Sequence, residues 1–327
     1  MNLKTTRRSL LAASTALALS VTGSVLAQPQ PAFPSQPIKV IVPYPPGGAT
    51  DILARMMAQK LGEAWSVNLV VENKPGAGGT IGNNQVAKAP PDGYTVLMAI
   101  TAIIQQPTLM NLPYDPLKDF APITQVARSP SMFAVPLNSP VSTLKDFVAL
   151  VKATPGKFNY GTYGAGTSAH IQGELLNKQA GLDMVHVPFQ GAAPLVTNMV
   201  GGQLTAAFID SASARAHLKS FKPLAVTGTQ RMAALPEVPT LKELGYHSYD
   251  PLGWFGMLLP AGTPTAIVNR YADEANRILK LPDVVARIEA LGLGVGGGRP
   301  EDFAQLLRSD AAIYARIIKD SNIKINP

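Results

Sequence analysis

The groups of this chain best suited to hold a small ion are free backbone N–H groups in four glycine-rich segments. Each segment follows a short apolar run and precedes a helix-like stretch, and they span residues 43–51, 73–82, 160–170 and 187–194. The first amides of a helix lack partners inside it, and its dipole adds about half a positive charge there. Glycines also permit tight turns without a ligand, but four such junctions, two in each half of the fold, favour an anion-binding cleft.

The first of these junctions shows the pattern most clearly. Val40–Val42 is an apolar run expected to form a buried strand, and the prolines and glycines after it must end that strand. Thr50 and Asp51 are helix-start residues. The apolar side chains that follow fall on one helical face: Ile52, Leu53, Met56, Met57 and Leu61. We expect the start of this helix to point its free amides at a small carboxylate.

Side chains suited to catalysis or metal binding show no such organisation. The chain has no cysteine, which excludes thiolate metal sites and a cysteine nucleophile. Its four histidines lack metal-ligand spacing. There is no Walker motif, H-E-x-x-H or G-x-S-x-G elbow, and the glycines of residues 76–82 match a dinucleotide fingerprint only weakly. We therefore predict no enzyme activity, no cofactor and no metal site.

Several polar side chains near the glycine-rich segments allow two interpretations. His170 could face a ligand or pack on a helix surface. Asp210 ends an apolar run beside two serines, so it could bind a ligand hydroxyl, amine or water, or cap the next helix. Tyr44 could cover a ligand or only the turn, and Arg215 could pair with a second carboxylate or lie in solvent.

These segments must be positioned by an α/β framework, because strand-like and helix-like stretches alternate along the chain. Such alternation predicts parallel strands with right-handed crossovers. An apolar strand at residues 253–259, with Trp254 and Phe255 in its core, should return to the first sheet, and three final helices should pack there. The result is two lobes joined by two crossing segments near Ala127 and Pro251. Their predicted boundaries are residues 28–127 with 252–327 for one lobe, and 128–251 for the other.

The amino-terminal 27 residues have the features of a cleavable signal peptide. Lys4, Arg7 and Arg8 precede a short apolar stretch, and Val25–Ala27 resembles a cleavage site. The adjacent arginines also fit a twin-arginine signal, although we favour an ordinary Sec signal that happens to contain two arginines. Removal would leave 300 residues and lower the formal net charge from +7 to +4. The signal peptide predicts a periplasmic protein. Because the remaining Lys and Arg residues are interspersed with acidic ones, we predict that the protein does not bind nucleic acid.

Beyond these patterns, the chain resembles a known family along essentially its whole mature length. The matching motifs are P-Y-P-P-G-G-A-T-D at 43–51, N-K-P-G-A-G-G-T-I-G at 73–82, A-x-x-P-P-D-G-Y-T at 87–95 and P-Y-D-P-L-K-D-F at 113–120. Further matches are Y-G-T-Y-G-A-G-T-S-A-H at 160–170, L-P-E-V-P-T-L-K-E-L-G-Y at 235–246 and G-W-F-G-M-L-L-P-A-G-T-P at 253–264. Together they resemble the Bug, or TctC-like, solute-binding proteins of tripartite tricarboxylate transporters.

The resemblance implies a type II periplasmic-binding fold that closes on its ligand like a Venus flytrap. Two loops of the first lobe would hold a ligand carboxylate through backbone N–H groups and ordered waters: Tyr44, Gly47, Gly48, Ala49, Thr50, Asp51, Gly76, Ala77, Gly78, Gly79 and Thr80. Loops of the second lobe would contact the rest of the ligand and set selectivity: Thr162, Ser168, His170, Phe189, Gln190, Gly191 and Asp210. Ile209 separates Phe208 from Asp210, where family members often have F-D-S or F-D-N, so the alignment of Asp210 is open by one residue.

The function that follows is that of a monomeric receptor for a small carboxylate, with a two-component membrane permease of the tripartite type as partner. A sensor-kinase ectodomain is an alternative partner, and an exported enzyme using the same cleft is a third hypothesis. The sequence does not identify the acid. Apart from Asp210, the sequence shows no obvious partner for the amino group of a ligand, so we favour a dicarboxylate or aromatic acid over an amino acid.

Overall fold

The computed structural model describes residues 33–215 and 217–325. All the elements below lie in one compact unit, which begins at Gln36. The predicted signal peptide, residues 1–27, lies outside the described residues. Within the described ranges, no helix has the length and apolar character needed to cross a membrane.

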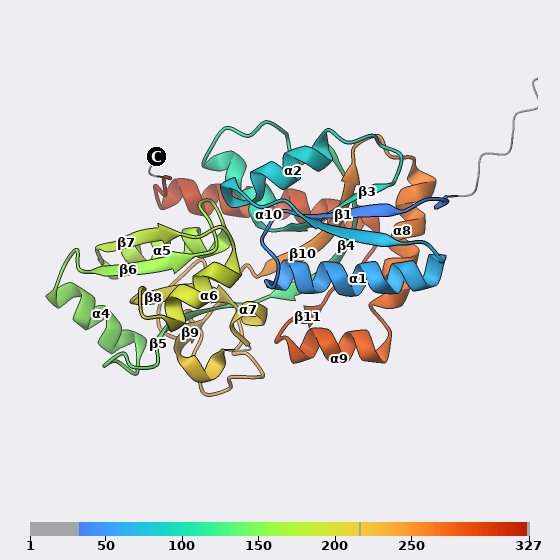
Figure 1. Ribbon diagram of the computed structural model, residues 1–327. Coiled ribbons are helices and arrows are strands. Elements are labelled where there is room, and N and C mark those ends of the chain that lie inside the picture. The colour runs from blue at the N-terminus through green and yellow to red at the C-terminus, as the bar shows by residue number, and fades with distance from the viewer. Residues whose placement is uncertain (1–32, 216, 326–327) are drawn as a thin grey trace, which may run out of the picture. The chain divides into compact units, whose positions relative to one another are not determined.

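A six-stranded sheet with the order β11-β4-β10-β3-β1-β2 forms the centre of the first lobe (Figure 1). Strands β1, β2 and β3 are parallel, as the alternating pattern predicts, whereas β10 runs antiparallel to β3 and β4, and β11 antiparallel to β4. The sheet is therefore mixed, because β4 and β10 carry the chain out of this lobe and back in opposite directions. The strands are β1 (Ile38–Val42), β2 (Leu69–Asn73), β3 (Thr95–Ile100), β4 (Phe120–Ser129), β10 (Gly253–Pro260) and β11 (Gly294–Val295).

Helices from both ends of the chain surround this sheet. The late helices α8 and α10 pack on β4, and α8 also packs on α1, which confirms that the end of the chain returns to the first lobe. The helices are α1 (Ala49–Trp65), α2 (Thr80–Ala87), α3 (Ala102–Gln105), α8 (Thr265–Ile278), α9 (Pro282–Ala290) and α10 (Pro300–Asp320), with short 3₁₀ turns η1 (Ala77–Gly79) and η2 (Gln106–Thr108). The sequence patterns did not reveal α3, η2 or β11, which are too short to show a periodicity.

A five-stranded sheet with the order β7-β6-β8-β5-β9 forms the centre of the second lobe. Strand β6 runs parallel to β7 and β8, and β5 runs antiparallel to β8 and β9. The strands are β5 (Ser131–Pro136), β6 (Phe158–Thr162), β7 (Met184–Pro188), β8 (Ala206–Asp210) and β9 (Phe221–Val226). The helices are α4 (Leu144–Ala153), α5 (Ser168–Ala180), α6 (Ala192–Val200) and α7 (Ser211–Arg215), with the 3₁₀ turn η3 (Leu218–Ser220).

The chain passes between the sheets twice. It leaves the first sheet at the end of β4, continues through Pro130 into β5, and returns between β9 and β10. These crossings agree in place with the expected segments near residues 127 and 251, while the exact lobe boundaries stay a prediction.

The helix predicted after the first glycine-rich segment shows why the sequence folds in this way. Leu53, Met57 and Leu61 are fully buried or nearly so, and Met56 is also buried. They recur on one face of α1, which packs against β1 and β2. Burial of such side chains contributes about 1.5–3 kcal/mol each. Hydrophobic burial therefore fixes α1 on the sheet, and its amino-terminal end lies at the carboxyl end of β1.

Candidate functional site

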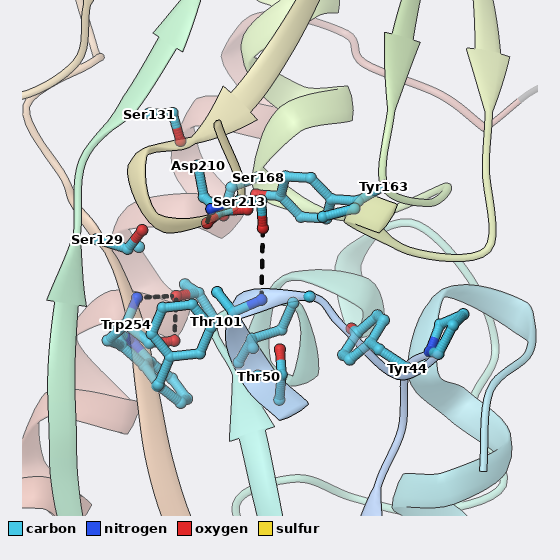
Figure 2. Close-up of a pocket in the computed structure, with 17 residues that line it drawn as sticks. Tyr44, Thr50, Thr101, Ser129, Ser131, Tyr163, Ser168, Asp210, Ser213 and Trp254 are labelled. Carbon is cyan, nitrogen blue, oxygen red and sulfur yellow. Dashed lines mark hydrogen bonds between the residues drawn. The ribbon is translucent and has the colours of Figure 1, made fainter. Parts of the chain in front are cut away.

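A small cavity lies between the two lobes, at the carboxyl ends of β3 and β8 and at the amino ends of β5 and β10. The volume accessible to water in this cavity is about 40 Å³, and one buried water needs about 10–15 Å³. Its lining residues are Tyr44, Pro45, Gly48, Ala49, Thr50, Ile100, Thr101, Ser129, Ser131, Tyr163, Ser168, Ala192, Asp210, Ser213, Gly253, Trp254 and Phe255. Figure 2 shows Tyr44, Thr50, Thr101 and Trp254 facing Tyr163, Ser168, Asp210 and Ser213 across it.

The first turn of α1 forms one wall of the cavity. Gly48 is the residue before the helix, and as a glycine it has no side chain that could cap the helix amides. The Ala49 N–H points across the cavity to Ser213 Oγ at 3.4 Å, a long contact that joins the two lobes (Figure 2). Because the first amides of a helix have no acceptor within it, this wall favours a negatively charged group.

Asp51 holds this turn in shape and does not line the cavity. Its carboxylate accepts hydrogen bonds from Gly47 N–H at 3.1 Å, Asn73 Nδ2 at 3.0 Å and Arg55 Nε at 3.0 Å. Burial alone would raise the pKa of Asp51, but the hydrogen bonds from Arg55, Asn73 and Gly47 outweigh burial and lower it. The ionised side chain thus links β2 to the glycine turn before α1.

The ends of β3 and β10 form the floor of the cavity. Thr101 Oγ1 accepts a hydrogen bond from the Trp254 N–H at 2.7 Å and lies 3.4 Å from the Trp254 carbonyl. The Trp254 indole donates to Asp310 Oδ2 at 3.1 Å. Trp254 and Phe255 are buried, as expected for a central strand, yet both line the cavity.

Asp210 and the serines around it form the wall contributed by the second lobe. Asp210 lies at the end of β8, is only 8% exposed, and accepts a hydrogen bond from the Ser213 N–H at 2.9 Å. Burial raises the pKa of Asp210, and the hydrogen bonds from Ser213 oppose that rise. Ser168 starts α5 and is hydrogen-bonded to the first-lobe residue Gln105, with Nε2 and Oγ 2.9 Å apart.

The second glycine-rich segment, residues 76–80, does not line the cavity but joins the lobes beside it. Tyr44 Oη donates to the Gly78 carbonyl at 2.9 Å, and Gln106 Nε2 donates to the same carbonyl at 3.0 Å. Gln106 Nε2 also lies 3.5 Å from the Ala165 carbonyl of the second lobe. A Cβ on Gly78 would lie 2.6 Å from that carbonyl oxygen, so the two loops are in close contact. The other members of this segment, Ala77, Gly79 and Thr80, belong to the same turn and the start of α2.

Thr162 and His170 lie behind the cavity wall. Thr162 Oγ1 is 2.7 Å from His186 Nε2, and His170 Nδ1 accepts from the Gly166 N–H at 3.2 Å. The His170 and His186 rings stack with centroids 4.0 Å apart. Burial lowers the pKa of His170 to about 4, so the ring is neutral at pH 7 and supports the turn that precedes α5.

Phe189, Gln190 and Gly191 form the turn between β7 and α6, and the residue after them, Ala192, lines the cavity. A Cβ on Gly191 would lie 2.7 Å from Pro45 Cδ, so this turn also approaches the first lobe closely.

Six of the residues proposed from sequence line the cavity: Tyr44, Gly48, Ala49, Thr50, Ser168 and Asp210. The other twelve lie in the same loops or directly behind the wall.

Several lining residues were absent from the sequence-based set. Thr101 directly follows β3, where the rule that ligands bind at the carboxyl ends of parallel strands could have indicated it. Ser129 and Ser131 flank the crossing from β4 to β5, and Trp254 begins the return strand. Crossing segments must lie beside a cleft between two lobes, so this position was the available signal. Among the described residues, no group of three or more His, Asp or Glu side chains could hold a metal ion.

The family model for the tripartite tricarboxylate transporter family receptor, TctC, matches residues 53–323. The chain belongs to the TctC family. This is a family of transport receptors and not a class of enzymes, and the recognition made from the sequence motifs is confirmed.

Several known proteins resemble the chain over most of its length. A protein encoded in the tcbD-tcbE intergenic region of Pseudomonas sp. (strain P51) is 36% identical over 324 residues, which cover 98% of this chain and 96% of that protein. A solved periplasmic transporter is 37% identical with a TM-score of 0.87, covering 90% of this chain and 100% of that one. R. palustris Rpa4515, solved with adipate, is 29% identical with a TM-score of 0.86, covering 89% of this chain and 99% of that one. These similarities confirm the predicted two-lobed periplasmic-binding fold.

Proposed function

We propose that this protein is a periplasmic receptor that captures a small carboxylate between its two lobes and delivers it to a two-component membrane permease of the tripartite type. The lobes comprise residues 28–127 with 252–327, and residues 128–251. Residues 1–27 act as the export signal. The TctC family and the periplasmic relatives support this location and role.

The observation that carries the proposal is the start of α1 at a cavity shared by both lobes. Gly48, Ala49 and Thr50 bring helix amides to one wall, and the second lobe provides hydroxyl groups opposite. A carboxylate there would accept hydrogen bonds from the amides and gain from the helix dipole, worth up to about 2 kcal/mol in a partly buried site. The adipate found with Rpa4515 shows that a related chain can hold a carboxylate.

Closure would trap the acid because contacts between the two lobes, beside and behind the cavity, hold them together around it. The contacts of Gly78 and Gln106 with Ala165, and of Gln105 with Ser168, join the lobes on one side. Ser211 Oγ donates to the Gly292 carbonyl at 2.9 Å and so connects the second lobe to the segment before β11. We propose that these contacts form when the ligand binds, so that the permease can distinguish loaded from empty receptor.

The residues proposed from sequence then have different tasks. Tyr44, Gly48, Ala49, Thr50, Ser168 and Asp210 contact the ligand. The remaining ones shape or close the site: Gly47, Asp51, Gly76, Ala77, Gly78, Gly79, Thr80, Thr162, His170, Phe189, Gln190 and Gly191.

A thermal-shift screen tests the proposed function. The protein would be unfolded and refolded to remove bound ligand, then heated with aliphatic dicarboxylates, amino acids, aromatic acids and monocarboxylates, each beside its amide or ester. A ligand at one hundred times its Kd adds about 2.7 kcal/mol to stability, which raises Tm by several degrees. We expect a shift with at least one acid and none with its amide or ester. A folded protein that responds to no acid would contradict a carboxylate receptor.

A further inference from the structure

The charge of the cavity wall is unusual for a site that receives an anion. Among the described residues that line it there is no Lys, Arg or His, and Asp210 is the one carboxylate. The backbone amides at α1 can hold a single carboxylate, but no basic side chain is present for a second one. The lining therefore suits one negative charge at the first lobe, with a different chemical group facing the second.

Asp210 is the charged side chain on the second-lobe wall that a ligand held at α1 would face. Its side chain lines the cavity and is more than nine-tenths buried. Among the described residues it takes part in no ion pair, and its partners are the Ser213 N–H, 2.9 Å from Oδ1, the Ser213 hydroxyl and backbone N–H groups of the same turn, all of them neutral. A buried carboxylate without a counter-ion is unfavourable, and an ammonium group placed beside it removes much of that cost.

We propose that Asp210 makes this receptor select a small zwitterion, whose carboxylate binds at the start of α1 and whose ammonium group pairs with Asp210. This inference rests on the proposed function, because it assumes that a carboxylate occupies the α1 wall. Tyr163 lies near Asp210 in the second-lobe wall (Figure 2), and its ring face can also stabilise a cation. A dicarboxylate such as the adipate bound by Rpa4515 would instead bring a second negative charge to Asp210.

A structural role for Asp210 must be separated from this one, because the same side chain caps α7. Asp210→Asn is suited to that purpose. Asparagine caps a helix about as well as aspartate, and it has the same shape, but it carries no charge. The substitution should therefore leave unfolding of the ligand-free protein nearly unchanged while removing the partner of the ammonium group.

The experiment is calorimetric titration of refolded protein at pH 7 with three matched series. The first contains α-amino acids and the ω-amino acids from β-alanine to 6-aminohexanoate. The second contains the corresponding dicarboxylates, and the third contains the simple monocarboxylates. We expect the best zwitterion to bind about tenfold or more tightly than its matched dicarboxylate, and Asp210→Asn to abolish that preference. As a control, Asp183→Asn removes the same charge from an exposed loop, and this variant should keep the preference for the zwitterion.

The outcomes separate the inference from the proposed function. A dicarboxylate that binds the wild type more tightly than every zwitterion, or an Asp210→Asn variant that retains the zwitterion preference, would overturn the inference and leave a carboxylate receptor intact. Equal loss of preference in Asp183→Asn would show a general charge effect and would also overturn it. Failure of all three series to bind would contradict both.

Discussion

A methyl group added at Gly78 should weaken ligand binding by preventing the lobes from closing. Gly78 has a φ of 64° and a ψ of 20°, in the left-handed region. A Cβ there would lie 2.6 Å from the Ala165 carbonyl oxygen and 2.6 Å from Gln106 Nε2. The Gln106 amide belongs to a side chain that can rotate away, but the Ala165 carbonyl belongs to the backbone of the opposite lobe. Gly78→Ala therefore forces these two loops apart.

The loss of ligand affinity depends only on the energetic cost that the substitution adds in the closed form and not in the open form. An alanine in the left-handed region costs about 1–2 kcal/mol whether the lobes are open or closed. Overpacking between the loops adds about 1–3 kcal/mol in the closed state alone. Since 1.4 kcal/mol is a tenfold change in Kd, the affinity should fall by about 5-fold to 150-fold.

The assay combines calorimetric titration with urea unfolding of ligand-free protein. The titrant is the acid that gives the largest shift in the thermal screen. Gly245→Ala is the matched control, because Gly245 also has a left-handed φ, +86°, while a Cβ there meets no atom within 4 Å. We expect similar losses of stability in the two variants and a loss of affinity in Gly78→Ala alone. Wild-type affinity in Gly78→Ala, or an equal loss in the control, would refute the closure argument.

Two further predictions concern the framework of the site. Asp51→Ala should lower the free energy of unfolding by about 2 kcal/mol at pH 7, because Gly47 N–H and Asn73 lose a charged acceptor. Since the folded-state pKa of Asp51 is lowered, this difference from wild type in urea unfolding should shrink as pH falls below about 4, and a pH-independent difference would contradict it. Gly173→Ala, within α5, would place a Cβ 2.0 Å from the buried ring of Tyr160. It should destabilise the protein by about 1–3 kcal/mol despite the better helix propensity of alanine, and a higher Tm would contradict that packing argument.

Most elements of the fold could be predicted because their signals are local. The apolar face of α1 repeats with helical spacing, and the prolines and glycines after β1 end that strand wherever the rest of the chain lies. The burial of Leu53, Met57 and Leu61 agrees with that periodicity. The mixed direction of the first sheet could not be predicted in the same way, because the antiparallel pairing of β10 with β3 and β4 joins segments far apart in sequence.

The features of the cavity also separate into those that local sequence predicts and those that only tertiary packing decides. The glycine-rich turns, the helix start at Ala49 and the absence of catalytic motifs follow from the order of residues, and so does the resemblance to the TctC family. Only the tertiary structure places Thr101, Trp254 and Asp210 on one small cavity, and shows the Gly78 loop meeting the opposite lobe instead of lining it. The physical reason is that helix starts and turns depend on neighbours in the chain. The depth and charge of a cavity depend instead on how distant strand ends pack together.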